Sequence, residues 1–124
     1  MARIRTIKPD FWTDEKIGKI SIPARLLFIG TWNFSDDSGQ LRWTPAYIKA
    51  QIFAYNEEIS LAMVRTWMAE LEQIGVVEPY RSESDESLAI VKKFLKHQVI
   101  NKPSKIRLPG PHLNGSSRTT VPLR

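Results

Sequence analysis

The fold is predicted chiefly by residues 44–81, TPAYIKAQIFAYNEEISLAMVRTWMAELEQIGVVEPYR. Thr44 can cap a helix with its hydroxyl, and Pro45 suits the first helical turn. We therefore expect a helix that begins at Pro45 and ends near Phe53. Residues 54–58 are expected to form a short turn after it.

A second helix is expected over residues 59–74, because its apolar residues recur three or four positions apart. Gly75 is a typical C-terminal stop, since glycine readily adopts the left-handed conformation. A strand over 76–81 follows. The residues that define the apolar face are Val64, Trp67, Leu71 and Ile74. Two helices joined by a short turn predict a helix-turn-helix unit.

Upstream of this unit, residues 21–34 predict another buried helix. Ser21 can cap it, and Pro23 lies in its first turn. The polar residues 35–39 predict a turn, and a short strand is expected over 40–43.

Downstream, a strand over 88–92 completes a hairpin whose polar tip is residues 82–86. The predicted order is helix, strand, helix, helix, strand, hairpin, strand. This order is typical of the α+β winged helix-turn-helix fold, with a three-helix core, a small antiparallel sheet and a β-hairpin wing.

We expect three segments along the chain. Residues 1–20 form a basic N-terminal arm and lead-in, and residues 21–95 form the winged-helix domain. Residues 96–124 are rich in proline and glycine and predict an extended basic tail.

The composition excludes several classes of protein. With 42% hydrophobic residues the chain has enough apolar surface to fold, which excludes a wholly disordered protein. The absence of cysteine excludes disulfides, thiolate metal sites and a cysteine nucleophile. No apolar run is long enough to cross a bilayer, so we expect a cytoplasmic protein with no membrane partner.

Positive charge is concentrated at the two ends of the chain. Residues 1–8 carry a net +3 and residues 92–124 a net +8, both without a carboxylate, whereas residues 9–91 carry −6. Long cationic stretches without carboxylates favour a polyanionic partner, with nucleic acid as the leading class. A solubilising tail is the alternative explanation.

Four segments resemble a known family: RIRTIKPDFW at 3–12, IPARLLFIGTWNFSDDSG at 22–39, YIKAQIF at 47–53 and FLKHQVINKPS at 94–104. They are similar to the N-terminal winged-helix domain of phage and prophage replication proteins, the replisome-organiser or DnaD-like initiator group. The resemblance implies binding of double-stranded DNA at a phage origin and recruitment of a replicative helicase or its loader. It implies nothing about catalysis, since such domains bind and do not react.

In a helix-turn-helix, the second helix enters the major groove while basic residues nearby contact phosphates. The N-terminal segment is expected to act as an arm in the minor groove, and the tail to extend the footprint. The candidate DNA contacts are Arg3, Arg5, Lys8, Lys49, Ser60, Arg65, Thr66, Arg81, Lys92, Lys93, Lys96, Lys102, Lys105 and Arg107.

Acidic residues near these contacts favour a second hypothesis. Glu70 and Glu72 lie in the second helix of the unit, and Glu83, Asp85 and Glu86 lie at the hairpin tip. Carboxylates beside phosphates are unfavourable. A protein-binding adaptor that uses the winged-helix body therefore stays open, as does a phage transcriptional regulator with the same fold. A homodimer is also left open.

We expect no catalytic residue, metal or cofactor. His97 and His112 are the only histidines, and neither has a cysteine or a nearby acid to share a metal. The adjacent Asp36 and Asp37 are explained by a turn. Trp32 and other tryptophans on apolar positions are expected in the core, and Phe11 with Trp12 to hold the arm onto the body. The expected location is the cytoplasm of a bacterial host, in association with the nucleoid.

Overall fold

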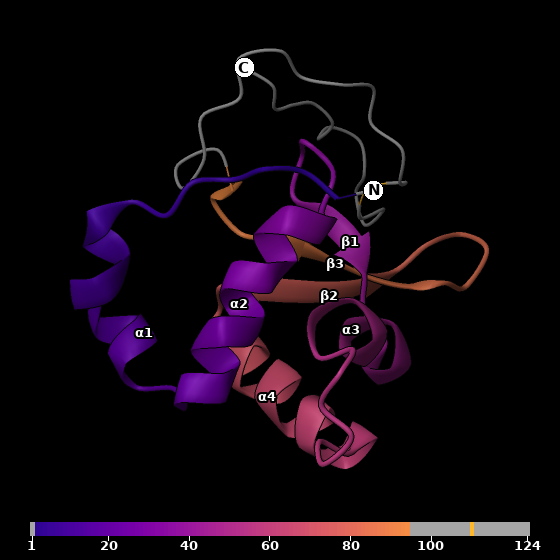
Figure 1. The fold of residues 1–124 in the computed structure, drawn as a ribbon. Helices are drawn as coiled ribbons and strands as arrows, with labels where there is room; N and C mark the ends of the chain where they lie inside the picture. The colour runs from indigo at the N-terminus through magenta and orange to yellow at the C-terminus, as the bar shows by residue number, and fades with distance from the viewer. Residues whose placement is uncertain (1, 95–109, 111–124) are drawn as a thin grey trace.

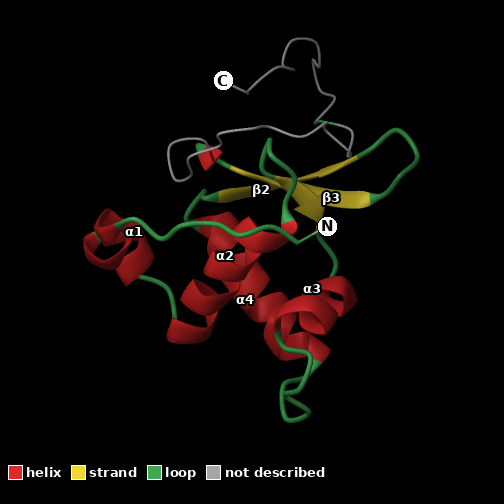
Figure 2. Cartoon of the chain, turned by 45° about the horizontal axis from the view of Figure 1, so that its top comes forward, coloured by secondary structure: helices red, strands yellow, loops and turns green. Residues whose placement is uncertain are grey.

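The computed structural model describes residues 2–94 and 110, which form an α+β fold (Figure 1). The helices lie on one face of a small antiparallel sheet (Figure 2). A short 3₁₀ helix comes first in the chain, and the other elements follow in this order: α1 Glu15–Gly18, α2 Ile22–Phe34, β1 Gln40–Arg42, α3 Pro45–Ile52, α4 Leu61–Gln73, β2 Val77–Arg81 and β3 Ser87–Val91.

Helices α2 and α3 begin at the caps that the sequence predicts, whereas the cap of α4 was not predicted. The Ser21 hydroxyl accepts from Ala24 N at the start of α2, and the Thr44 hydroxyl accepts from Tyr47 N at the start of α3. Ser60 caps α4 in the same way, so this helix begins two residues later than the expected 59. Each cap satisfies an amide that the first helical turn leaves without a backbone acceptor.

The sheet has the strand order β1-β3-β2, so the first strand pairs with the last and not with its neighbour in the chain. Leu41 of β1 lies opposite Ala89, and Ala89 lies opposite Pro79 of β2. Leu41, Ala89 and Val91 belong to the hydrophobic core, which places this face of the sheet against the helices. The expected small antiparallel sheet and hairpin are confirmed.

The core lies between the helices and the sheet. Trp32 and Phe28 of α2 are 2% and 1% exposed and pack edge to face, with ring centroids 5.3 Å apart. Trp43 is buried and Trp67 packs against the core, as their apolar positions predict.

The lead-in before residue 21 is more structured than the sequence indicates. It contains a 3₁₀ helix, Pro9–Thr13, and the four-residue α1. Phe11 and Ile17 are in the core, whereas Trp12 is 65% exposed. Phe11 therefore anchors this segment as expected, and Trp12 does not. Elements of four or five residues are too short to show a helical period, which is why the sequence did not predict them.

Candidate nucleic-acid interface

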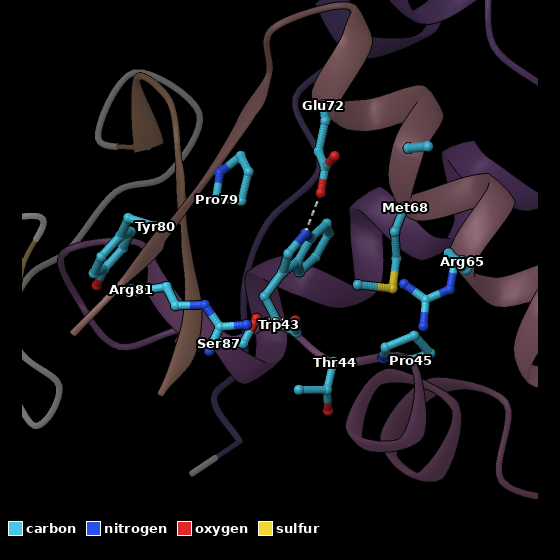
Figure 3. Close-up of a pocket in the computed structure, with 11 residues that line it drawn as sticks. Trp43, Thr44, Pro45, Arg65, Met68, Glu72, Pro79, Tyr80, Arg81 and Ser87 are labelled. Carbon is cyan, nitrogen blue, oxygen red and sulfur yellow. Dashed lines mark hydrogen bonds between the residues drawn. The ribbon is translucent and has the colours of Figure 1, made fainter. Parts of the chain in front are cut away.

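A groove of about 560 Å³ lies between α4, the β2–β3 hairpin and the start of α3 (Figure 3). One wall is a face of α4 and the other is the strand β2. Thr44 and Pro45 lie at the end where α3 begins. The lining residues are Trp43, Thr44, Pro45, Arg65, Met68, Ala69, Glu72, Pro79, Tyr80, Arg81 and Ser87.

Helical geometry explains the α4 wall. Arg65, Met68, Ala69 and Glu72 are spaced three or four residues apart and therefore share one side of the helix. Met68 is buried, while the other three are exposed. The groove thus has an apolar base and a polar rim.

Arg65 and Arg81 approach the groove from opposite walls. Figure 3 shows their side chains extending toward one another from α4 and β2, with Trp43 and Ser87 between them. Both arginines are exposed. The Arg65 guanidinium makes no hydrogen bond or ion pair within residues 2–94, so all five of its N–H donors can bind an anion or a base edge.

The two carboxylates of α4 are engaged in contacts that hold the fold together. Glu72 Oε2 accepts from Trp43 Nε1 at 2.7 Å, the bond drawn in Figure 3. Glu70 accepts from the Ser21 amide at 2.7 Å and from the Ser21 hydroxyl at 2.8 Å. Glu70 therefore lies on the α2 side of the helix, away from the groove, and only Glu72 faces the groove.

Ser60 and Thr66 lie on the exposed side of α4, as the sequence predicts, but both make local hydrogen bonds. The Ser60 hydroxyl accepts from Met63 N at 3.1 Å. The Thr66 hydroxyl donates to the Ala62 carbonyl oxygen, also at 3.1 Å. A hydroxyl that accepts in one bond still has a donor for a phosphate, so Ser60 can cap the helix and bind an anion at once.

Arg5 is not available as an arm residue, which corrects the sequence-based expectation. Its side chain is 6% exposed, and its Nε donates to the Trp32 carbonyl oxygen at 2.8 Å. Its Nη2 donates to the Ser35 carbonyl oxygen and pairs with Asp37 Oδ1 at 3.2 Å. The guanidinium also lies 5.0 Å from the centroid of the Phe94 ring. Arg5 is thus an interior residue.

Arg3 is fixed beside Arg5. Its amide donates to the Asn33 carbonyl oxygen at 2.8 Å, and Asn33 Nδ2 donates back to the Arg3 carbonyl oxygen at 2.7 Å. Arg3 Nε lies 3.8 Å from Asp37 Oδ1. The segment around Arg3 is therefore bound along the end of α2, in place of the extended minor-groove arm that the charge pattern suggested.

The other lysines that the sequence proposes as DNA contacts, within residues 2–94, do not line the groove. Lys49 is half-buried in α3. Lys92 Nζ pairs with Glu78 Oε1 at 3.0 Å. Lys92 and Lys93 follow β3, at the end of the strand opposite the hairpin tip, and with Lys8 they border a separate cavity of about 750 Å³. The expected contacts Lys96, Lys102, Lys105 and Arg107, and both histidines, lie outside the described residues.

Sequence reasoning missed part of the groove. Trp43, Thr44 and Glu72 contribute to its lining, although the sequence identified them only as a core residue, a cap and an unfavourable charge. The signal that could have placed Thr44 here is its position at the start of the first helix of the helix-turn-helix. Nothing local in the sequence indicates that Trp43 and Glu72 meet, because 29 positions separate them.

Burial raises the pKa of the Tyr80 hydroxyl far above its ordinary value of 10.0, and the negative charge of Asp36 raises it further. Within the described part of the chain, no group of three or more His, Asp or Glu side chains could hold a metal ion. None of the helices in residues 2–94 is long and apolar enough to cross a membrane.

Comparison of the chain with protein-family models, with curated proteins and with solved structures finds no match.

Proposed function

We propose that the chain is a duplex-DNA-binding module of the winged-helix type. The observation that carries the proposal is the groove, in which Arg65 and Arg81 extend toward one another from α4 and the hairpin. The order of the elements and the strand order β1-β3-β2 are compatible with this fold.

In the proposed complex α4 lies in the major groove. Ala62 and Ala69 are exposed on α4 and are small enough to let the helix backbone approach the base edges. Arg65 and Gln73, which are also exposed, supply hydrogen-bonding groups for a base edge or a phosphate. Arg81 binds a backbone phosphate from the other wall.

The start of α3 supports the same orientation. Thr44 and Pro45 line the groove, so the positive end of the α3 dipole faces the space where the phosphates would lie. Repulsion between Glu70 and DNA phosphates was one argument against DNA binding. The argument loses weight because the Glu70 carboxylate is directed to Ser21, away from the groove.

The biological role that we propose follows from the resemblance of four segments to phage and prophage replication proteins. In this role the module binds duplex DNA in the host cytoplasm, on the nucleoid, at the start of replication, and a helicase or helicase loader is a further partner. A phage transcriptional regulator is the alternative. Both roles need the same DNA contact and differ in the DNA site.

One observation favours a second candidate function, a protein-binding adaptor. The hairpin tip, residues 82–86, carries three exposed carboxylates, those of Glu83, Asp85 and Glu86. Such a surface suits a basic protein better than a phosphate backbone.

The proposal is tested by fluorescence anisotropy of a labelled random-sequence duplex with Arg65→Ala, Arg81→Ala and the control Lys19→Ala. Lys19 is an exposed cation that follows α1, and α1 and α3 lie on opposite sides of α2 (Figures 1 and 2). We expect each arginine variant to weaken binding at least about fivefold, and the control to change it less than about twofold.

Equal effects of all three substitutions would show that binding depends on net charge and not on the groove. A wild-type chain that binds no duplex at low salt would contradict DNA binding and favour the adaptor.

A further inference from the structure

Two carboxylates of the hairpin tip form ion pairs with arginines of the neighbouring strands. Arg81 Nη1 donates to the Asp85 carbonyl oxygen at 2.8 Å and lies 3.4 Å from Asp85 Oδ1. On β1, Arg42 Nη1 lies 3.4 Å from Glu86 Oε2. Arg81 also lines the groove, so the guanidinium that the proposed function assigns to a phosphate is the one that the Asp85 carboxylate contacts.

The backbone of the tip keeps Asp85 in this place. The Ser82 amide donates to the Glu86 carbonyl oxygen at 3.1 Å, and the Asp85 amide donates to the Ser82 carbonyl oxygen at 2.9 Å. The Ser82 hydroxyl also accepts from the Glu86 amide at 3.1 Å, and Ser82 is 6% exposed. This network fixes the backbone of the turn at Asp85.

Asp85 adopts a φ of +68°, in the left-handed region. Among residues other than glycine, aspartate and asparagine tolerate this region best, because their short polar side chains form hydrogen bonds locally. The turn therefore accepts either residue, but only aspartate supplies a negative charge next to Arg81.

We propose that Asp85 is an intramolecular competitor of DNA phosphate at Arg81. A carboxylate offers a guanidinium the same anionic oxygen acceptors as a phosphate does. In the free protein Asp85 neutralises Arg81, and duplex DNA has to displace this carboxylate to gain the Arg81 contact. This inference rests on the proposed function. It predicts that the hairpin weakens duplex binding by the groove.

The test measures the dissociation constant for a random-sequence duplex at low salt, with Asp85→Asn, the control Glu83→Gln, Arg81→Ala and the double variant Arg81→Ala/Asp85→Asn. Glu83 is exposed in the same tip and makes no ion pair within residues 2–94, so its variant removes the same charge without freeing an arginine. Asp85→Gly, which also tolerates a positive φ, serves as a second variant of the same position.

We expect Asp85→Asn and Asp85→Gly to bind the duplex about threefold more tightly than wild type, the size typical of an exposed ion pair. Glu83→Gln should gain clearly less. In the Arg81→Ala background, Asp85→Asn should raise the affinity for the duplex no more than Glu83→Gln does in the wild type. Higher salt should reduce the difference between Asp85→Asn and wild type, because salt screens exposed charges.

Two results would overturn the inference: a gain from Asp85→Asn no larger than that from Glu83→Gln, or an equal gain with Arg81 absent. Failure of the proposed function looks different, because then neither the wild type nor any variant binds the duplex.

Discussion

Arg5 lies at the centre of a polar cluster that joins the N-terminal segment to the rest of the molecule. Its guanidinium donates to main-chain oxygens of Trp32 and Ser35 and pairs with Asp37, whose side chain is 4% exposed. A buried charge is tolerated only where charge and hydrogen bonds compensate it. Arg5 is therefore expected to contribute to stability and not to DNA binding.

Arg5→Ala should lower the free energy of unfolding by about 3–5 kcal/mol, because it leaves the buried Asp37 carboxylate without its closest cation. Arg3→Ala is the matched control. The Arg3 side chain is 31% exposed and lies 3.8 Å from the same carboxylate, so its loss should cost about 1 kcal/mol or less. Urea denaturation measures both, and equal losses would contradict the assigned burial of Arg5.

Tyr80 is expected to make the free energy of unfolding decrease with pH in the alkaline range. Its pKa is raised by burial, so the folded state holds the phenolic proton more tightly than the unfolded state does. The stabilisation is complete below about pH 10, the unfolded pKa, and decreases as the pH rises above it.

Urea denaturation between pH 8 and pH 11 measures this effect, with Tyr80→Phe compared with Tyr55→Phe. Tyr55 is 97% exposed and should behave as wild type. Above pH 10 the free energy of unfolding should fall less steeply with pH in Tyr80→Phe. The difference in slope should correspond to the release of up to about one proton on unfolding. The pH slopes are compared, and not the stabilities, because the Tyr80→Phe substitution also removes the hydroxyl group at every pH. Identical slopes would refute the prediction.

At the scale of elements, α4 depends on its cap and on its contacts with two neighbouring segments. Ser60 begins the helix, Glu70 ties it to the start of α2, and Glu72 ties it to Trp43 beside β1. These contacts orient the helix so that Arg65 faces the hairpin across the groove. In the sequence, Glu70 and Glu72 argue against DNA binding. In the structure, both carboxylates help to position α4.

Ser60→Ala should lower the free energy of unfolding by about 1 kcal/mol, because an amide of the first turn loses its acceptor. Ser60→Asp should retain most of the stability, since aspartate is also a good cap. If Ser60 contacts a phosphate, as the sequence predicts, the aspartate variant should nevertheless bind duplex DNA more weakly because its carboxylate repels the phosphate. Thermal unfolding and anisotropy measure the two effects, and a stable Ser60→Asp protein with unchanged affinity would exclude that contact.

In the molecule as a whole, the charges are unevenly distributed, and residues 2–94 carry almost no net charge. Residues 2–94 contain twelve Lys and Arg and thirteen Asp and Glu, whereas residues 95–124 contain six cations and no carboxylate. The groove arginines therefore supply local contacts, and the attraction of the whole chain to a polyanion depends on residues beyond Phe94.

Replacement of Lys96, Lys102, Lys105 and Arg107 by Gln should flatten the salt dependence of duplex binding, by up to about 0.9 in log–log slope for each phosphate that these cations neutralise. A titration of binding affinity against salt measures the slope. The control, Lys16→Gln/Lys19→Gln, removes two exposed cations at α1 and should leave the slope unchanged. An unchanged slope in the fourfold variant would assign these residues a solubilising role.

The starts of α2 and α3 could be predicted from local sequence. Ser21 and Thr44 cap them as predicted, because a cap depends on groups within three or four positions of the same chain, whereas the cap of α4 at Ser60 was not predicted. The hairpin was predictable for the same reason, since its two strands are separated by a short polar stretch. Arg65 and Arg81 could be named as candidate site residues because each lies in a helix or strand that the sequence predicts, and both line the groove.

Which distant residues meet could be learned only from the packed structure. It placed β1 beside β3, buried Arg5 against Asp37 and brought Glu72 to Trp43. In the sequence, Arg5 is one of three cations in an acid-free stretch and looks like a DNA contact. Its burial depends on carbonyl groups and a carboxylate about 30 positions away, which become neighbours only once the N-terminal segment lies along the end of α2. Local patterns set the elements because their energies are local, whereas contacts between elements exist only after the core has formed.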